Sequence, residues 1–278
     1  MIETQIPGAR GIVVFHNKNA LPYIAVPHLH SQYEICYNIE GGKGFLVGGE
    51  FYKLGRRDLI LIPKVMTHKV LVSPNAEYER CIINLDDATI AHMGAICEDV
   101  NALQFLTTCE HPRLLTLSED RHEKFLFLIR EFNLLENEGD KLSLLSKLFE
   151  LLVFLRDAFA VSAPAAPMME QAELSYADRV FAIIEKSYAT VSVAQIAEQL
   201  YLNEDHICRV FKKETGVTIK HYLTSRKLAE AKKYLYLGYN VKDAGIHAGF
   251  HDYANFIRTF KKYEGYSPGN MEGLEKPI

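Results

Sequence analysis

The sequence is poor in cysteine and has no long apolar run, and each shortage excludes a class of protein. Its five cysteines are odd in number and contain no Cys-x-x-Cys pair. They are typical of small apolar core residues in a reducing compartment, and they exclude a disulfide framework and a cysteine-based zinc site. No stretch of about 18 apolar residues occurs, and the first residues lack a basic-then-apolar signal pattern. We therefore expect a cytoplasmic protein that has no membrane partner.

Charge is distributed unevenly along the 278 residues. Residues 174–278 carry 15 Lys and Arg against 12 Asp and Glu, whereas residues 1–173 carry 16 against 23. A basic half fits DNA binding, because contacts with the phosphate backbone are mostly electrostatic. Small residues and two prolines gather between the two parts, as is typical of an interdomain linker. We predict a first domain over residues 1–161, a linker over 162–174 and a second domain over 175–278.

The second domain contains one pattern twice. Residues 192–216 and 240–265 each predict a short helix, a turn and a second helix that contains the string Arg-x-Phe-Lys-Lys. This repeat indicates two helix-turn-helix units, each of which offers one helix to a major groove of double-stranded DNA. Residues 219–237 predict a connecting helix roughly 28 Å long. A spacer of that length suits two recognition helices in successive major grooves, which lie about 34 Å apart.

Side chains at i, i+3, i+4 and i+7 of the second helix in the first unit form an outward stripe, and a corresponding stripe is expected in the second unit. We expect Arg209 to read a guanine through O6 and N7, and the lysines that follow it to anchor phosphates. In the second unit, Arg258 is the expected base or backbone contact, and Ile257 either touches a thymine methyl or packs on the neighbouring helix. The predicted DNA-binding residues are Asp205, His206, Cys208, Arg209, Lys212, Lys213, Tyr253, Ile257, Arg258 and Lys261.

The first domain changes to strand patterns. Residues 12–85 form short alternating runs separated by Gly, Pro and Asn, which predict a small β-barrel or sandwich able to hold one small ligand. Residues 119–138 and 141–161 then show helical spacing of apolar side chains. These helices either pack on their own domain or form part of a homodimer interface, and the two roles are compatible.

A cluster of histidines and a glutamate lies among the predicted strands. His28 and His30 share a strand face with Glu34, and His68 follows on another strand, which together make the donor set of a divalent transition-metal site. The same side chains also suit the wall of a pocket for an organic effector, or structural hydrogen bonds to the backbone. We assign the organic effector, a hydroxyl-rich molecule such as a sugar, and predict no cofactor and no catalytic residue. The predicted effector pocket consists of His28, His30, Glu34, Tyr37, Asn38 and His68.

Several strings resemble a known family. SVAQIAEQLYL, HICRVFKKETG and FIRTFKKYEGYSP resemble the DNA-binding domain of AraC/XylS regulators, and HLHSQYEICYNIEGGKGF resembles the cupin-type effector domain often attached to it. The resemblance implies an α+β chain, with an N-terminal cupin-like β-barrel and flanking dimerisation helices, a linker, and a C-terminal all-α domain with two helix-turn-helix units. It also implies a homodimeric, effector-responsive activator of carbohydrate-related genes that works with RNA polymerase. The alternative is a metal-dependent cupin enzyme with a regulatory DNA-binding tail.

The chain departs from the family pattern in its second unit and in the connecting helix. Ala244-Gly245 stands where Ile-Ala is usual, and a glycine inside a helix costs about 0.5–1 kcal/mol relative to alanine. Arg226-Lys227 stands where Leu-Arg is usual. We therefore expect the second unit to dock more loosely and to contribute less specificity than the first.

Overall fold

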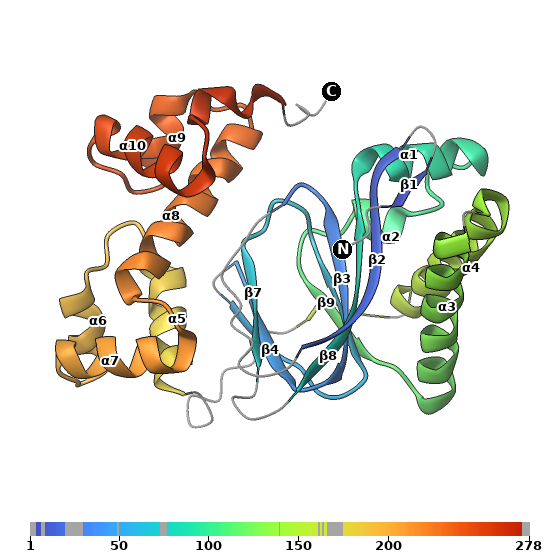
Figure 1. Ribbon diagram of the computed structural model, residues 1–278, viewed down its shortest axis with the longest axis horizontal. Helices are drawn as coiled ribbons and strands as arrows, with labels where there is room; N and C mark the ends of the chain where they lie inside the picture. The colour runs from blue at the N-terminus through green and yellow to red at the C-terminus, as the bar shows by residue number, and fades with distance from the viewer. Residues whose placement is uncertain are drawn as a thin grey trace.

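The computed structural model divides into a β-rich N-terminal half and an all-helical C-terminal half (Figure 1). No helix in the described part of the chain has the length and apolar character needed to cross a membrane. The predicted linker and His28 lie largely or wholly outside the described residues. The structure describes residues 4–6, 9–19, 30–48, 50–72, 77–138, 140–160, 162, 164–165 and 175–273.

Two antiparallel sheets form the N-terminal half, as the alternating strand runs predict. The six-stranded sheet has the order β1 (Thr4–Ile6), β2 (Ala9–Asn19), β8 (Tyr78–Leu85), β3 (Tyr33–Glu40), β6 (Asp58–Ile62) and β9 (Arg113–Thr116). The three-stranded sheet has the order β5 (Glu50–Lys53), β4 (Gly42–Val47) and β7 (His68–Val72). The helices of this half are α1 (Asp87–Ile96), α2 (Gln104–Thr107), α3 (Glu119–Glu138) and α4 (Lys141–Phe159).

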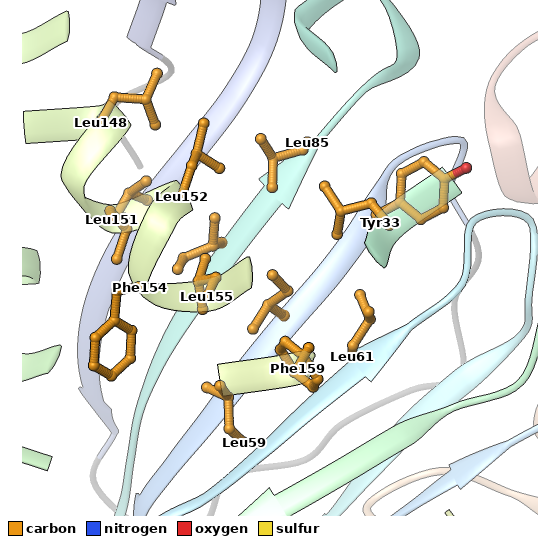
Figure 2. Packing of buried hydrophobic residues seen from close by; sticks show 14 of the residues in the cluster. Tyr33, Leu59, Leu61, Leu85, Leu148, Leu151, Leu152, Phe154, Leu155 and Phe159 are labelled. Carbon is orange, nitrogen blue, oxygen red and sulfur yellow. The ribbon is translucent and has the colours of Figure 1, made fainter. Parts of the chain in front are cut away.

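Alternation along β3 divides the core of this half in two. Cys36 points between the sheets, into an apolar cluster that includes Phe45 and Val70. Its neighbour Ile35 points the other way, into a larger cluster that α3 and α4 complete. Figure 2 shows leucines of α4, among them Leu155, facing the side chains of the six-stranded sheet. Because both faces of β3 are covered, its first six residues are all buried. The prediction that the two long helices pack on their own domain is confirmed.

Six α-helices and a final 3₁₀ turn are described in the C-terminal half. Three of these helices start at a capping residue, since Ser192, Asn203 and Asp252 each accept a backbone N–H of the helix that follows. Both recognition helices end at a glycine with positive φ, a conformation that glycine adopts without strain. The elements are α5 (Tyr176–Ser187), α6 (Val193–Gln199), α7 (Glu204–Thr215), α8 (Ile219–Tyr236), α9 (Val241–His247), α10 (Tyr253–Glu264) and the turn Pro268–Gly273.

Gly245 packs closely and is not a point of weakness. A Cβ atom at this position would lie 2.7 Å from Cδ1 of Phe256, too close for any real contact. In the first unit, Ala197 and Ile207 hold the corresponding places, counted from the caps of their helices. The second unit thus combines a smaller residue on α9 with a larger one on α10, and both are buried. Phe256 fills the space that a side chain at 245 would take, so the glycine is required by the packing of α9 on α10. How tightly the second unit docks on DNA stays a prediction.

Candidate DNA interface and effector site

Helix α7 exposes most of the predicted DNA-facing stripe. Asp205, Arg209, Lys212 and Lys213 are exposed, and they follow one another at helical spacing. His206 is half-buried, and its Nδ1 lies 3.5 Å from Nη2 of Arg209. The structure therefore presents a guanidinium and two ammonium groups together on one surface of the first unit, which suits both base and phosphate contacts.

Two of the predicted contacts face the protein more than the solvent. Cys208 is half-buried and packs against the core of the first unit. Ile257 is half-buried in the second unit and packs against the cluster around Phe256 and Phe260, so the packing alternative for Ile257 is the one observed. The other predicted residues of α10, which are Tyr253, Arg258 and Lys261, are exposed.

The connecting helix α8 carries two residues whose roles the sequence did not reveal. Arg226 is buried, with Nε 2.5 Å from Glu185 of α5 and Nη1 2.8 Å from Glu230 one turn along α8. Lys227 donates to the carbonyl oxygens of Ala189 and Gly249, at 3.2 and 3.0 Å. These carbonyls lie ahead of α6 and α10, so one lysine ties the connecting helix to both units. Residues 226 and 227, at which the chain differs from the family pattern, therefore make the contacts that hold α8 against its neighbours and so orient the recognition helices.

In the N-terminal half, three of the predicted pocket residues converge. Oε2 of Glu34 lies 3.1 Å from Nε2 of His30 and 3.4 Å from Nε2 of His68. The two imidazole rings meet edge to face, with centroids 5.0 Å apart. Glu34 and His68 are almost wholly buried, whereas His30 is half-buried. We refer to His30, Glu34 and His68 as the triad.

Hydrogen bonds to the backbone fix the direction of both imidazoles. Nδ1 of His30 lies 3.0 Å from the carbonyl oxygen of Gln32, and Nδ1 of His68 lies 2.8 Å from that of Met66. Since a carbonyl only accepts, each Nδ1 carries a hydrogen and each Nε2 is turned toward the carboxylate. Contact between Nε2 and a carboxylate oxygen is favourable when a proton or another cation lies between them.

Burial and charge act against each other in the triad. Burial would raise the pKa of Glu34, but the charge of His68 and hydrogen bonds from both histidines hold it well below its usual range. Burial would lower the pKa of His68, yet the Glu34 carboxylate outweighs it and raises that pKa above its ordinary value. The triad is thus a charged, internally paired cluster at the edge of an apolar interior.

The triad also has the donor set of a metal site. One ligand atom from each residue lies within 4.8 Å of the other two. Two imidazoles and one carboxylate suit divalent transition metals, and histidine ligands commonly donate their other ring N–H to a backbone carbonyl, as both do here. The residues therefore fit a divalent transition metal as well as they fit hydrogen bonds to an organic ligand.

Tyr37 and Asn38, the remaining described residues of the predicted pocket, lie elsewhere. Tyr37 faces α3, where its Oη lies 2.5 Å from Nδ1 of His122 and its ring packs on Phe125. The Asn38 amide is used by the backbone, since its Nδ2 donates to the carbonyl oxygens of Gly42 and Gly55. Neighbouring residues of a strand point to opposite faces, so Tyr37 cannot share a pocket with Glu34.

Comparison with known proteins gives matches in both halves. The AraC-like ligand binding domain matches residues 11–152, and a helix-turn-helix domain matches residues 196–272. The HTH-type transcriptional regulator YtdP of Bacillus subtilis is 31% identical over 103 residues, which cover 36% of this chain and 13% of YtdP. The Msm operon regulatory protein of Streptococcus mutans is 29% identical over 140 residues, 48% of each chain. The matches thus span less than half the length of either relative.

Two solved structures illustrate the structural matches. ToxT from Vibrio cholerae, bound to (E)-4-(8-methylnaphthalen-1-yl)but-3-enoic acid, is 12% identical over 94% of this chain and 98% of its own, with a TM-score of 0.36. The C-terminal domain of the response regulator yesN from Fusobacterium nucleatum is 29% identical over 33% of this chain and 91% of that domain, with a TM-score of 0.32.

A ligand-binding β domain followed by two helix-turn-helix units defines a ligand-responsive, DNA-binding transcription regulator. The ligand-binding description alone matches half of the sequence, and the curated relatives are transcription regulators. The chain belongs to the AraC family. It is a regulator and not an enzyme, which removes the alternative of a cupin enzyme with a DNA-binding tail.

Proposed function

We propose that this regulator is a cytoplasmic activator of carbohydrate-related genes whose effector is a small hydroxyl-rich molecule bound at the triad. The observation that carries the proposal is the burial of Glu34 and His68 beside an apolar interior. A carboxylate and two imidazoles offer the acceptors and donors that sugar hydroxyls need. The ring of Phe45 lies 6.5 Å from that of His68, so an apolar face adjoins the polar groups.

The protein is further proposed to act as a homodimer on paired DNA sites and to engage RNA polymerase there. Large apolar side chains remain exposed on the two long helices, and a second copy of the chain would cover them. These residues are Phe127, Leu134, Leu142 and Val153.

Thermal denaturation of the full chain tests the effector class. We expect a monosaccharide or oligosaccharide to raise the melting temperature of the chelator-treated protein, because a ligand that binds the native state stabilises it. Glu34→Gln should abolish that shift, whereas Glu40→Gln, an exposed residue at the end of the same strand, should retain it. Stabilisation by an apolar aromatic compound and by no sugar would contradict the proposal. Stabilisation by zinc or manganese alone would assign the triad to a metal.

Selection of binding sites from random duplex DNA tests whether both helix-turn-helix units read the DNA sequence. Enriched paired half-sites about one helical turn apart are expected if both recognition helices enter successive major grooves. Enrichment of a single half-site would show that the second unit does not read bases.

Substitution of Arg209 separates base reading from phosphate binding. On the selected site, Arg209→Ala should lose roughly 1–3 kcal/mol of binding free energy and relax the preference at one position. Lys213→Ala should weaken binding to all sequences about equally and flatten the salt dependence. Fluorescence anisotropy over a salt series measures both, with Lys43→Ala in the other half as a matched control. Unchanged affinity and preference in Arg209→Ala would show that α7 docks differently.

A further inference from the structure

A lysine from the effector domain is buried in the DNA-binding domain. Lys69 lies on β7 and is only 6% exposed. Its Nζ lies 3.1 Å from the centre of the Phe181 ring on α5 and 5.5 Å from that of Tyr222 on α8. An ammonium over an aromatic face at this distance makes a cation–π contact, which is strongest when water is excluded. We refer to Phe181 and Tyr222 as the aromatic pocket.

The rest of the outer face of the three-stranded sheet also packs on the helical half. Leu46, which lies opposite Lys69 in the β4–β7 register, belongs to the same apolar cluster as Phe181 and Tyr222. Leu71 of β7 belongs to it as well. Figure 1 shows β4 and β7 on the side of the β-rich half that faces α5. The two domains therefore share one continuous core at this sheet.

Electrostatic attraction and loss of hydration oppose each other at Lys69. The negative charges of Asp178 and Glu185 attract the Lys69 ammonium, whereas its burial opposes the charged form. Glu185 is already engaged, since it accepts from Arg226 and, at 3.0 Å, from Oη of Tyr222. The ammonium thus gains cation–π and Coulomb attraction but loses most of its hydration.

The residue before Lys69 belongs to the triad. Consecutive residues of a strand point to opposite faces, so His68 points inward to Glu34 while Lys69 points outward to the aromatic pocket. One peptide unit of β7 therefore connects the proposed effector site with the DNA-binding domain. Strand β7 also pairs with β4 alone, which leaves its other edge free of a strand partner in the described sheet.

We propose that Lys69 couples the two domains: a ligand that draws on Glu34 and His68 shifts β7, withdraws Lys69 from the aromatic pocket and frees the two helix-turn-helix units to take the spacing that DNA requires. The coupling rests on the proposed effector site at the triad. A ligand can shift this equilibrium only if it binds one state more tightly than the other, the states being Lys69 inside the aromatic pocket and Lys69 withdrawn from it. Contact of the ligand with His68 supplies that difference in affinity.

Hydrogen exchange in the full-length chain tests the contact without any effector. In Lys69→Ala, the peptides that contain Phe181 and Tyr222 should exchange about 30-fold faster, the size expected for loss of a desolvated cation–π contact. Lys69→Met keeps the apolar stem but removes the ammonium, so it should lose most of the same protection. Protection close to that of the wild type in Lys69→Met would assign the contact to packing of the stem and overturn the role of the ammonium. Lys43→Ala, an exposed site on the same sheet, should leave it unchanged. Amides of β3 and β6 serve as the internal standard for an intact fold. Unchanged exchange of the two peptides in Lys69→Ala would overturn the proposal.

A double-mutant cycle tests the coupling. Glu34→Gln perturbs the triad, so it should change exchange at the aromatic pocket in the wild-type background and have no further effect in Lys69→Ala. Equal effects in both backgrounds would show that the triad communicates by another route, which would overturn the coupling role. Because no effector is used, these results are independent of whether a sugar stabilises the protein.

Discussion

Arg226→Met is expected to lower the free energy of unfolding of the helical half by about 3–5 kcal/mol. Arg226 and its two partners, Glu185 and Glu230, are each less than 7% exposed. Removing the guanidinium leaves the buried carboxylate of Glu185 without its ion-pair partner and leaves Glu230 only the more exposed Lys233, whose Nζ lies 3.6 Å away. This is far less favourable than an apolar core. Burial would lower the pKa of Arg226, but the two carboxylates outweigh it and raise that pKa, so the side chain is charged at every accessible pH.

Urea unfolding followed by circular dichroism measures the loss. Arg209→Met, on the exposed face of α7, is the matched control and should change stability by less than about 0.5 kcal/mol. Combining Arg226→Met with Glu185→Leu and Glu230→Leu should recover much of the loss, because an apolar replacement of a whole buried ion cluster is often neutral. Recovery will be partial, since Tyr222 loses the acceptor of its hydroxyl. A cost below about 1 kcal/mol for Arg226→Met alone would show that the network is dispensable.

Gly245→Ala is expected to destabilise the second unit by about 1–3 kcal/mol. Helix propensity acts in the opposite direction, because alanine is favoured over glycine by about 1 kcal/mol in a helix interior. The new Cβ, however, would lie 2.7 Å from Cδ1 and 3.0 Å from Cγ of Phe256. That ring is fully buried, so it cannot move without displacing its neighbours. Overpacking should therefore outweigh propensity.

A second substitution separates these two effects. Gly245→Ala combined with Phe256→Ile recreates the Ala197–Ile207 pair of the first unit and should recover most of the lost stability. Gly269→Ala is a matched control, because a Cβ there meets no atom within 4 Å. If Gly245→Ala instead raised the unfolding midpoint, propensity would dominate and the contact between α9 and α10 would be looser than the structure indicates.

Short-range patterns were sufficient to predict most of the fold. Ser192 and Asn203 mark helix starts because their side chains bond to amides within three residues, and such contacts are visible in any sequence. Apolar periodicity places Ile207 and Phe211 in a core for the same local reason. The repeated units, the two-domain order and the exposed Arg209 all depend on patterns shorter than about one helix.

The predicted effector pocket shows what short-range patterns cannot predict. His30 and Glu34 meet as the sequence predicts, although His30 lies before β3, which begins at Tyr33. Placing Tyr37 with Glu34 ignored the alternation of side chains along β3. His68 lies on β7 and Glu34 on β3, and these strands belong to different sheets. The two residues meet only because the two sheets face each other. Sequence spacing alone could nominate these residues but could not show which of them meet.

The order of residues along the chain therefore identified an AraC-type regulator, and it nominated the exposed side chains that we propose to contact DNA. Long-range packing assigned the roles of Arg226, Gly245 and Lys69, because each depends on a partner from another element. A buried charge is stabilised only if an opposite charge or a hydrogen-bond partner packs against it. A glycine is required only where neighbouring atoms occupy the space of a side chain. Those atoms come from distant parts of the chain, and no local pattern encodes their approach.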